Sequence, residues 1–327
     1  MGAVITSVGI ETLRGIRTGL VEGLGPLSVL VGPNNSGKST VLDAVLIGAA
    51  PEPWKAIAFV VGRRGALEKG VRWLFWRSGE RASVVVRTQA GVERRCTLTK
   101  HTPSTVAGAS NMPDGTATSF HVSFDDGNQV AGWGGSTPAL EEVPEARLVE
   151  PHRGMVQEPL HRTYNRALEA GRIEEVNALL RELLPEGLRQ VEISAPEDKP
   201  VVYVSYRDGA VPAWLQGDGI QCVLRLGLEL AAAPGGVVLL EEPETAQHPR
   251  SLQESARTVV AAVKRGVQVI LSTHSLDLID MLRAHLGDDL EKLSVHNLAC
   301  AGGALSVVRY SGADVALARD AIGEDLR

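Results

Sequence analysis

Hydrophobic positions near the N-terminus fall into short runs that are followed by one longer periodic stretch. Val4 to Ile10 and the residues around Val21 flank a Gly/Arg turn, and Leu27 to Val31 is an apolar run that ends at a glycine; these runs predict strands. From Gly37 to about Ile47, apolar residues recur at helical spacing. The chain is therefore expected to begin with strands and then to enter a helix directly after the third apolar run.

The pattern changes between Val71 and Phe124, where apolar and polar residues alternate. The alternating runs are separated by Ser-Gly, Ala-Gly and Pro-Asp-Gly turn signals and comprise Ser83 to Thr88, Val92 to Thr97 and Ser119 to Phe124. Alternation with turn signals predicts an antiparallel meander. Residues 101–117 and 125–145 are rich in Gly, Ser, Thr and Pro and are expected to be loops.

After a short strand around Ala146 to Glu150, the stretch from Glu158 to Leu184 predicts two amphipathic helices broken near Gly171. A hairpin and another helix, Gly219 to Ala232, are expected next. The final third alternates strand and helix over Val237 to Leu240, Ser251 to Lys264, Val267 to Leu271, Leu276 to Leu286, Leu293 to Leu298, Ala304 to Tyr310 and Ala313 to Ile322. Such alternation predicts parallel strands joined by crossover helices, and therefore an α/β fold.

Composition narrows the class of protein. The chain has 327 residues, 44% of them hydrophobic and 22% charged, which is typical of a globular protein and excludes a disordered chain. The longest apolar stretch, Leu228 to Leu240, is interrupted and too short for a membrane helix, so no membrane partner is expected. Cys96, Cys222 and Cys300 form no close pair, and no secretion signal is evident, so a reducing, cytoplasmic location is expected.

The strongest motif is a full match to G-x-x-x-x-G-K-[ST], placed after a predicted strand and before a predicted helix. Backbone N–H groups of such a loop converge on phosphate oxygens at the positive end of the helix dipole. Lys38 is expected to bridge the β- and γ-phosphates of ATP, and the Ser39 hydroxyl to ligate Mg²⁺. The expected nucleotide-binding residues here are Gly32, Pro33, Asn34, Asn35, Ser36, Gly37, Lys38, Ser39 and Thr40.

Two further strands end in residues suited to phosphate chemistry. The apolar strand from Val237 ends in Glu241 and Glu242, at the sheet edge where the predicted loop also lies. Glu241 is expected to reach the Mg²⁺ shell, and Glu242 to polarise the attacking water. The strand from Val269 ends at His274, which is placed to sense a γ-phosphate. The absence of an Asn-Lys-x-Asp motif argues against a GTPase.

The order of motifs resembles the ABC-type ATPases of the RecF, SMC and OLD (overcoming lysogenization defect) group. The resemblance rests on GPNNSGKST, the GDGIQ element at 217–221, LLEEPETAQHP and VILSTHS. It is closest to a stand-alone OLD-like AAA ATPase domain without the Toprim nuclease, because only 53 residues follow His274. It implies a P-loop NTPase of ABC-ATPase type, with a mixed core sheet, an antiparallel β-meander and a small helical lobe.

The resemblance also implies how the chain is divided and what it does. Residues 1–327 would form one ATPase domain, with lobe I at 1–150 and 235–327 and lobe II at 151–234. Two such heads dimerise around ATP, and Gly217, Asp218 and Gly219 would touch the partner's nucleotide. Lys38, Glu242 and His274 would be catalytic. On this resemblance the chain is a Mg²⁺-dependent ATPase that forms a homodimer, or a heteromer with a nuclease or effector in DNA repair or phage defence.

Several departures leave alternatives open. Glu241 replaces the usual Asp and is one methylene longer; Leu215 stands where transporter-type signatures have Ser, so hydrolysis is expected to be slow. Residues 244–247 would be the D-loop, and the Q-loop residue stays open among Glu150, His152, Arg153 and Gln157. The alternatives to the regulatory ATPase are the energising subunit of a membrane transporter and a non-hydrolysing ATP sensor.

A basic segment stands out in an acidic protein with net charge −6. Between Arg63 and Lys100, basic residues exceed acidic ones by seven and are interleaved with Trp73, Phe75 and Trp76. Such a segment can bind nucleic acid, with Arg94 and Arg95 as phosphate contacts. The simpler alternative places Trp73 and Phe75 in the core and the arginines on a solvated face.

Overall fold

The computed structural model describes residues 4–63, 73–100, 117–124, 130–134, 145–150, 158–184, 187–233, 235–322 and 325–326. The strands are β1 (Ile5–Leu13), β2 (Ile16–Glu22), β3 (Leu27–Val31), β4 (Arg81–Thr88), β5 (Glu93–Lys100), β6 (Ala117–Phe124), β7 (Val130–Gly134), β8 (Ala146–Val149), β9 (Leu188–Ser194), β10 (Val201–Tyr206), β11 (Ala210–Pro212), β12 (Val237–Glu241), β13 (Gln268–Ser272), β14 (Leu293–Ala301) and β15 (Ala304–Ser311). The helices are α1 (Lys38–Ala49), α2 (Pro53–Gly62), α3 (Leu160–Glu169), α4 (Ile173–Leu183), α5 (Asp218–Ala231), α6 (Pro249–Lys264), α7 (Leu276–Leu286) and α8 (Gly312–Leu317).

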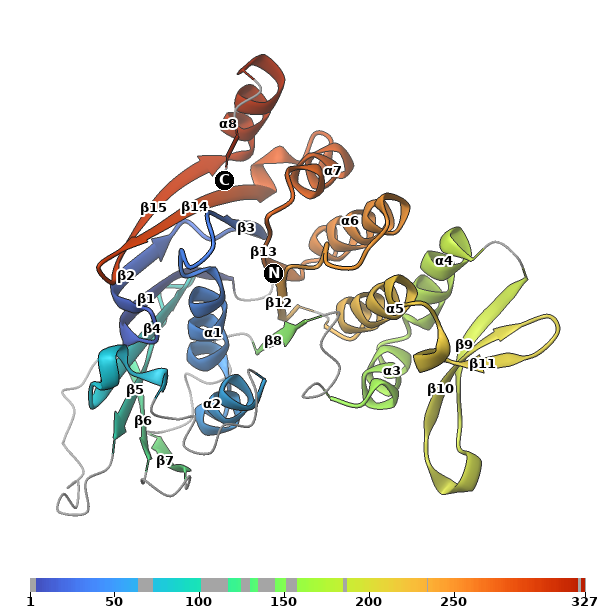
Figure 1. Ribbon diagram of the computed structural model, residues 1–327, viewed down its shortest axis with the longest axis horizontal. Helices are drawn as coiled ribbons and strands as arrows, with labels where there is room; N and C mark the ends of the chain where they lie inside the picture. Colours follow the sequence, from blue (N-terminus) through green and yellow to red (C-terminus); the bar gives the residue numbers. More distant parts are fainter. Residues whose placement is uncertain are drawn as a thin grey trace.

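A large mixed sheet runs through the left part of the molecule in Figure 1. Its strands follow the order β7-β6-β5-β4-β1-β2-β15-β14-β3-β13-β12-β8. The strands β14, β3, β13, β12 and β8 pair in parallel, whereas β1 pairs antiparallel with both β2 and β4. This is the mixed α/β sheet that the sequence predicts, and it places β3 between β14 and β13.

The predicted antiparallel meander is only partly correct. Strands β4 and β5 are antiparallel, as are β6 and β7, but β5 and β6 pair in parallel, with Glu93 opposite Ala117. A parallel pair requires the chain to return to the starting end of the sheet, which a short turn cannot do. The long connection over 101–116 fits this requirement; it lies outside the described residues. Three further elements, α2, β7 and β11, were not expected.

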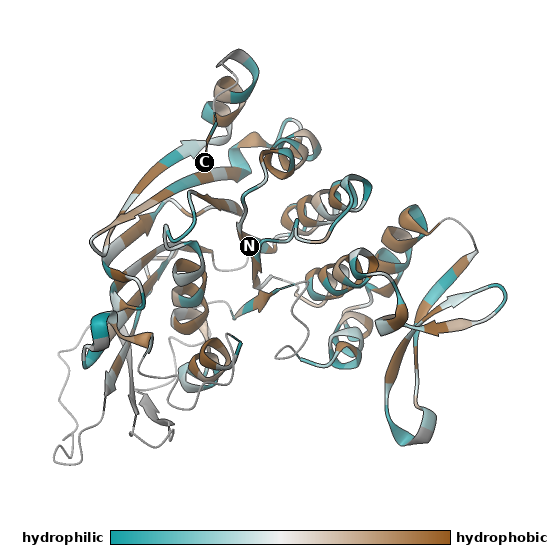
Figure 2. Ribbon diagram, in the orientation of Figure 1, coloured by the Kyte–Doolittle hydropathy of each residue, from teal (hydrophilic) through white to brown (hydrophobic). Residues whose placement is uncertain are grey.

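The sheet buries two hydrophobic clusters, one on each face. Side chains alternate along buried strands, so successive residues of β12 go to opposite clusters: Val237 and Leu239 pack with α1 and α2, whereas Val238 and Leu240 pack with α6 and α7. Strands that are apolar on both faces are typical of parallel sheets covered by helices on both sides. In Figure 2 strand β12, beside the N-terminus label, carries the hydrophobic colour, whereas α5 and α6 carry both colours.

A third hydrophobic cluster belongs to the helical unit, which we define as residues 158–233. It joins α3, α4 and α5 to the small sheet β11-β10-β9, through side chains that include Leu180, Val204 and Leu228. Helix α5 contributes to two clusters, because Leu226 and Leu230 pack toward α6 and the large sheet. The helical unit therefore docks on the large sheet through α5, to one side of it in Figure 1.

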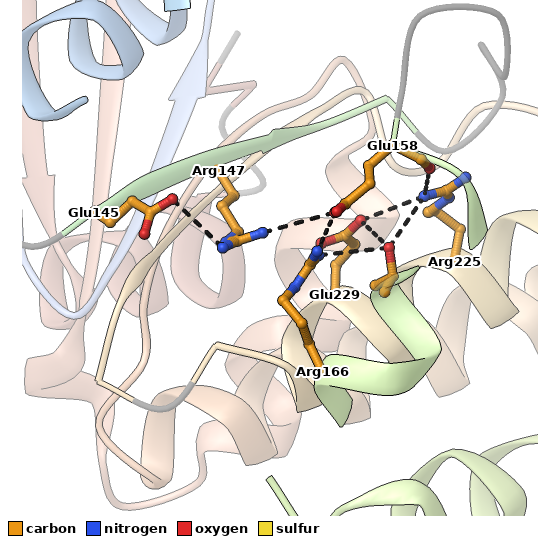
Figure 3. Close-up of polar contacts among 7 residues, drawn as sticks. Glu145, Arg147, Glu158, Arg166, Arg225 and Glu229 are labelled. Carbon is orange, nitrogen blue, oxygen red and sulfur yellow. Dashed lines mark hydrogen bonds and ion pairs between the residues drawn. The ribbon is translucent and has the colours of Figure 1, made fainter. Parts of the chain in front are cut away.

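Polar contacts also cross between the large sheet and the helical unit (Figure 3). Arg147 of β8 lies 3.4 Å from Glu145 and 3.8 Å from Glu158. Glu158 is the first residue of the helical unit. Glu158 pairs with Arg166, and its backbone carbonyl accepts a hydrogen bond from Arg225 at 2.8 Å. Glu229 closes the network, 3.3 Å from Arg166 and 3.4 Å from Arg225. Three arginines and three glutamates thus balance in charge across this junction.

Candidate functional site

The loop between β3 and α1 has the backbone of a phosphate-binding loop. Gly32 and Gly37 have φ of 133° and 99°, and Asn35 has φ of 66°. A Cβ on Gly32 would lie 2.3 Å from the carbonyl oxygen of Leu298, so only glycine fits between the loop and β14. No side chain caps α1, whose N-cap is Gly37. The first N–H groups of the helix are therefore available to an anion.

Lys38 is folded against this loop. Its Nζ donates to the carbonyl oxygens of Gly32 at 2.8 Å and Pro33 at 3.1 Å, and the residue is 6% exposed. Burial lowers the pKa of Lys38, and the neighbouring carboxylates Glu242, Glu244 and Glu241 oppose this shift. Three acidic side chains from the end of β12 therefore act electrostatically on the lysine of the loop.

The pairing of the strands explains this proximity. Strand β13 pairs in parallel with both β3 and β12, so the loop and the residues after β12 and β13 lie at the same edge of the sheet. Glu241 is the last residue of β12 and is 9% exposed, and the Glu242 N–H donates to the carbonyl oxygen of Ser272 at 3.0 Å. The structure thus brings Lys38 close to Glu241 and Glu242, although the lysine is far from the two glutamates in the sequence.

Glu242 and His274 face each other across this edge. The His274 Nε2 lies 3.6 Å from Glu242 Oε1, and both side chains are partly exposed. Glu242 has φ of 46°, in the left-handed region that a non-glycine residue rarely adopts. Backbone in this region costs energy and persists only where the surrounding structure holds it in place. Residues of this kind are concentrated at functional sites.

Glu244 fixes the loop that carries His274. Its Oε1 accepts hydrogen bonds from Thr273 Oγ1 at 2.7 Å and from the His274 N–H at 2.8 Å. Ser275 then caps α7 by accepting from Leu278 N at 3.1 Å. The segment after β12 and the loop after β13 are therefore tied together within one chain.

A buried ion cluster lies beneath the site and was not predicted from the sequence. Arg63, directly after α2, donates to Asp43 of α1, to Glu150 at the end of β8 and to Glu241. Its side chain is 1% exposed, and Arg14 pairs with the same Asp43. Burial alone would lower the pKa of Arg63, but Asp43, Glu241 and Glu150 outweigh it and raise that pKa.

The Gly217–Gly219 element lies at the start of α5, where Gly217 is the N-cap. Gly219 approaches the segment after β12, since a Cβ on it would lie 3.4 Å from the carbonyl oxygen of Ala246. Asp218 and Ala246 line a cavity of about 400 Å³ beside this helix. Trp214 and Leu215, which are separated from the element by Gln216, are 58% and 67% exposed.

Of the Q-loop candidates, Glu150 is 4% exposed and pairs with Arg63, whereas His152, Arg153 and Gln157 lie outside the described residues.

The assignment of Arg94 to a nucleic-acid surface is wrong, because Arg94 is 1% exposed and its Nη2 donates to the Ala50 carbonyl oxygen. Alternation along β5 places Arg94 on the same face as the buried Cys96.

The aromatic residues of the basic segment also differ from the simple alternation. Phe75 is 3% exposed, as expected for a core residue, but Trp73 is 58% exposed. Arg77 lies over the Trp76 ring, 5.0 Å from its centroid. Arg64, Lys69 and Arg72 lie outside the described residues. The described part of the segment therefore holds both core and surface side chains.

The residues present fit ATP and Mg²⁺. The buried Ser36 Oγ is among the side-chain atoms of the described residues that have no hydrogen-bond partner, and it lies inside the loop that would surround a phosphate. The Ser39 hydroxyl and the Glu241 carboxylate are oxygen ligands of the kind that Mg²⁺ prefers. Within the described residues, no helix is both long and apolar enough to cross a membrane.

Comparisons with known proteins agree with this geometry. Residues 139–280 match the family described as "AAA domain, putative AbiEii toxin, Type IV TA system". An uncharacterized protein of Methanocaldococcus jannaschii is 37% identical over 70 residues, which cover 21% of this chain and 61% of that protein. The chain therefore spans less than two thirds of the curated relative that it matches.

Solved structures show the same fold at low sequence identity. An SMC head bound to the C-winged helix domain of ScpA superimposes with a TM-score of 0.60 at 14% identity, covering 94% of this chain and 97% of that one. An SMC head with an extended coiled coil, bound to the C-terminal domain of ScpA and derived from Pyrococcus furiosus, gives 0.57 at 12% identity, covering 98% and 100%. The fold is thus that of the SMC head domains, a P-loop NTPase fold.

Proposed function

We propose that the protein binds ATP with Mg²⁺ and hydrolyses it. The observation that carries the proposal is the meeting of the β3–α1 loop, Glu241, Glu242 and His274 at one sheet edge, with Glu242 3.6 Å from His274. Lys38 and the helix N-terminus bind the phosphates, and Ser39 and Glu241 hold Mg²⁺. The bound ion would neutralise charge on the phosphate oxygens. Glu242 accepts the proton of the attacking water, and His274 contacts the γ-phosphate.

We further propose that ATP joins two copies of the chain, with Gly217, Asp218 and Gly219 of one copy against the nucleotide of the other. The exposed position of this element at the start of α5 supports a contact made in trans. The division into lobe I (1–150 and 235–327) and lobe II (151–234) belongs to this proposal, and the separate hydrophobic cluster of the helical unit supports it. Opening and closing of the dimer would regulate a protein partner, and the binding of the similar SMC heads to domains of ScpA supports such a partner.

The test uses two substitutions at the site. Lys38→Ala removes the cation from the loop and is expected to abolish ATP binding in isothermal titration. Glu242→Gln keeps the size of the side chain but cannot accept a proton, so it should retain binding and lower single-turnover hydrolysis by about 10²–10⁴-fold. With ATP it should accumulate as a dimer in light scattering.

Glu182→Gln on the exposed side of α4 is the matched control, since it removes one carboxylate away from the site. Normal ATP affinity of Lys38→Ala would overturn the nucleotide site. Undiminished hydrolysis by Glu242→Gln would remove Glu242 from its proposed role. A wild type that binds ATP without single-turnover hydrolysis would instead identify a non-hydrolysing sensor.

Four expectations remain predictions from the sequence: the OLD-like affiliation, a nuclease or effector partner, a role in phage defence and the transporter-subunit alternative.

Binding of DNA also remains a prediction, and it now depends on residues other than Arg94. Arg77, Arg81, Arg87 and Arg95 are the described cations that keep some exposure in this region. Gel-shift titration of duplex DNA at low salt, with Arg77→Glu and Arg95→Glu compared with wild type, tests it.

A further inference from the structure

We propose that Arg63 is a positioning residue that holds Glu241 in the orientation needed to bind Mg²⁺ in the ATP site. This inference rests on the proposed function and assigns a role to a residue outside all the nucleotide-binding motifs. Arg63 follows α2, and its partners are 20, 87 and 178 positions away along the chain. Its contacts connect the helix after the P-loop to the ends of β8 and β12.

The geometry of the guanidinium fits this role. One nitrogen, Nη1, donates to both Glu241 Oε2 and Glu150 Oε1, and the other, Nη2, donates to Asp43 Oδ1. A planar guanidinium with fixed donor directions sets the orientation of each carboxylate that it binds. With Oε2 held by Arg63, the Glu241 carboxylate can turn only as far as this contact allows.

The charges of the cluster show what removal of Arg63 would do. Arg14 and Arg63 supply two positive charges, and Asp43, Glu150 and Glu241 supply three negative ones, all with side chains at most 16% exposed. Without Arg63, Asp43, Glu150 and Glu241 would each lose a buried cationic partner in a medium that screens charge poorly. Repulsion would then move Glu241 away or favour its protonated form, and either change removes a metal ligand.

The cluster also explains why Glu can stand where the related ATPases have Asp. The longer side chain of Glu241 has one more rotatable bond and would lose more conformational freedom on binding a metal. Because Arg63 already orients this carboxylate in the folded chain, part of that ordering precedes metal binding. Groups that orient metal ligands in this way change metal affinity by about 10–100-fold when they are replaced.

The experiment measures the affinity of a fluorescent ATP analogue in Mg²⁺ and in EDTA. The ratio of the two dissociation constants gives the gain due to Mg²⁺. Arg63→Gln is expected to reduce this gain by about 10–100-fold while the dissociation constant in EDTA stays within about twofold of wild type. Arg63→Lys keeps the positive charge but lacks the fixed donor directions of the guanidinium. Its Mg²⁺ gain should lie between those of wild type and Arg63→Gln. Where Arg63→Gln does not fold, Arg63→Lys carries the test.

Two further variants separate positioning from general destabilisation. Arg94→Gln removes another buried arginine of the same sheet, 1% exposed, whose Nη2 donates to the Ala50 carbonyl oxygen; it should leave the Mg²⁺ gain unchanged. Glu241→Gln should reduce the gain, and adding Arg63→Gln to it should reduce it no further.

A wild-type Mg²⁺ gain in folded Arg63→Gln, or an equal loss of gain in Arg94→Gln, would overturn the role of Arg63 and leave the proposed function intact. Independent, additive losses in Glu241→Gln and Arg63→Gln would also overturn it, because the two residues would then act separately. If wild type binds the analogue in neither Mg²⁺ nor EDTA, the proposed function itself is wrong.

Discussion

At the scale of single residues, His296 is a buried titratable group outside the candidate site. It lies on β14, next to the strand that leads into the P-loop, and is fully buried. Its Nε2 lies 3.1 Å from Ser294 Oγ. Burial, assisted by Arg309, lowers the pKa of His296 to about 4 from its usual 6.5. The folded protein therefore holds this imidazole neutral.

This predicts a pH-dependent loss of stability. Above pH 6.5, His296 is neutral in both the folded and the unfolded protein, so it does not lower the free energy of unfolding. Between pH 6.5 and about pH 4, the unfolded protein binds a proton at His296 and the folded protein does not, so the free energy of unfolding decreases. The loss should amount to about 3 kcal/mol. Urea unfolding between pH 7 and pH 4 measures it, as the difference between wild type and His296→Asn. Parallel pH curves for the two proteins would contradict the prediction.

The two buried arginines show what the sequence conceals at this scale. Arg63 and Arg94 both belong to a basic segment, and a count of charges treats them as part of one cationic surface. Arg63 is balanced by carboxylates from three distant parts of the chain, and Arg94 is oriented inward by strand alternation. The motif residues were predictable because phosphate chemistry requires them at fixed local spacing. Arg63 has no local pattern, so only the folded structure reveals it.

At the scale of elements, two glycines within helices lie in close contact with a neighbouring element, one with the sheet and one with another helix. A Cβ on Gly48 of α1 would lie 2.5 Å from Val86 Cγ1 of β4. A Cβ on Gly227 of α5 would lie 2.9 Å from Leu179 Cδ2 of α4. Val86 is β-branched and fixed in the sheet, whereas Leu179 meets the Cβ with the end of a flexible side chain.

Gly48→Ala is therefore expected to destabilise the protein, although alanine favours helices. Overpacking costs about 1–3 kcal/mol, which exceeds the gain in helix propensity of about 1 kcal/mol. Gly227→Ala should be close to neutral because Leu179 can turn away. Thermal unfolding of both variants beside wild type checks the order. Equal stability of the two variants would mean that the α1–β4 contact adjusts more easily than the geometry indicates.

The predicted elements also differ in how well local pattern determines them. Leu27 to Val31 and Leu276 to Leu286 match the observed β3 and α7 exactly, because an apolar run and a periodic face mark each. The parallel pairing of β5 with β6 could not be predicted, because it depends on the path of the chain between them rather than on either strand. Helix α2 was not predicted, although it begins at Pro53 and proline is common in the first helical turn.

At the scale of the whole molecule, the exposed pair Trp214 and Leu215 lies where the proposed dimer would form. Both precede Gly217, and the Gln221 side chain holds the turn by donating to the carbonyl oxygens of Trp214 at 3.2 Å and Gln216 at 2.7 Å. The two side chains are 58% and 67% exposed in the single chain. A symmetric dimer would bury this pair twice.

Trp214→Ser or Leu215→Ser, made in the Glu242→Gln background, should weaken the ATP-dependent dimer. Burial of such a side chain contributes about 1.5–3 kcal/mol, so the dimer dissociation constant should rise at least tenfold. Leu168→Ser is the control, since Leu168 on α3 is 54% exposed and lies apart from Gly217 in the sequence. Sedimentation velocity with ATP measures the dimer. An equal effect of all three changes would contradict a specific contact.

The central position of β3 has a consequence for the order in which the protein is made. Both neighbours of β3 come from the far end of the chain: β13 spans Gln268–Ser272 and β14 spans Leu293–Ala301. The Gln268 side chain also donates to the Ile5 carbonyl oxygen at 2.7 Å and accepts from the Ile5 N–H at 2.8 Å.

A nascent chain therefore exposes the P-loop strand without a partner until more than two hundred later residues have been translated. At ribosomal rates of about 5–20 residues per second, this wait lasts roughly 10–50 s. Throughout that time, β3 is an uncovered apolar strand that chaperones and other nascent chains can reach. Nucleotide cannot assist folding during synthesis, because the site on which it would act is among the last features of the molecule to be completed.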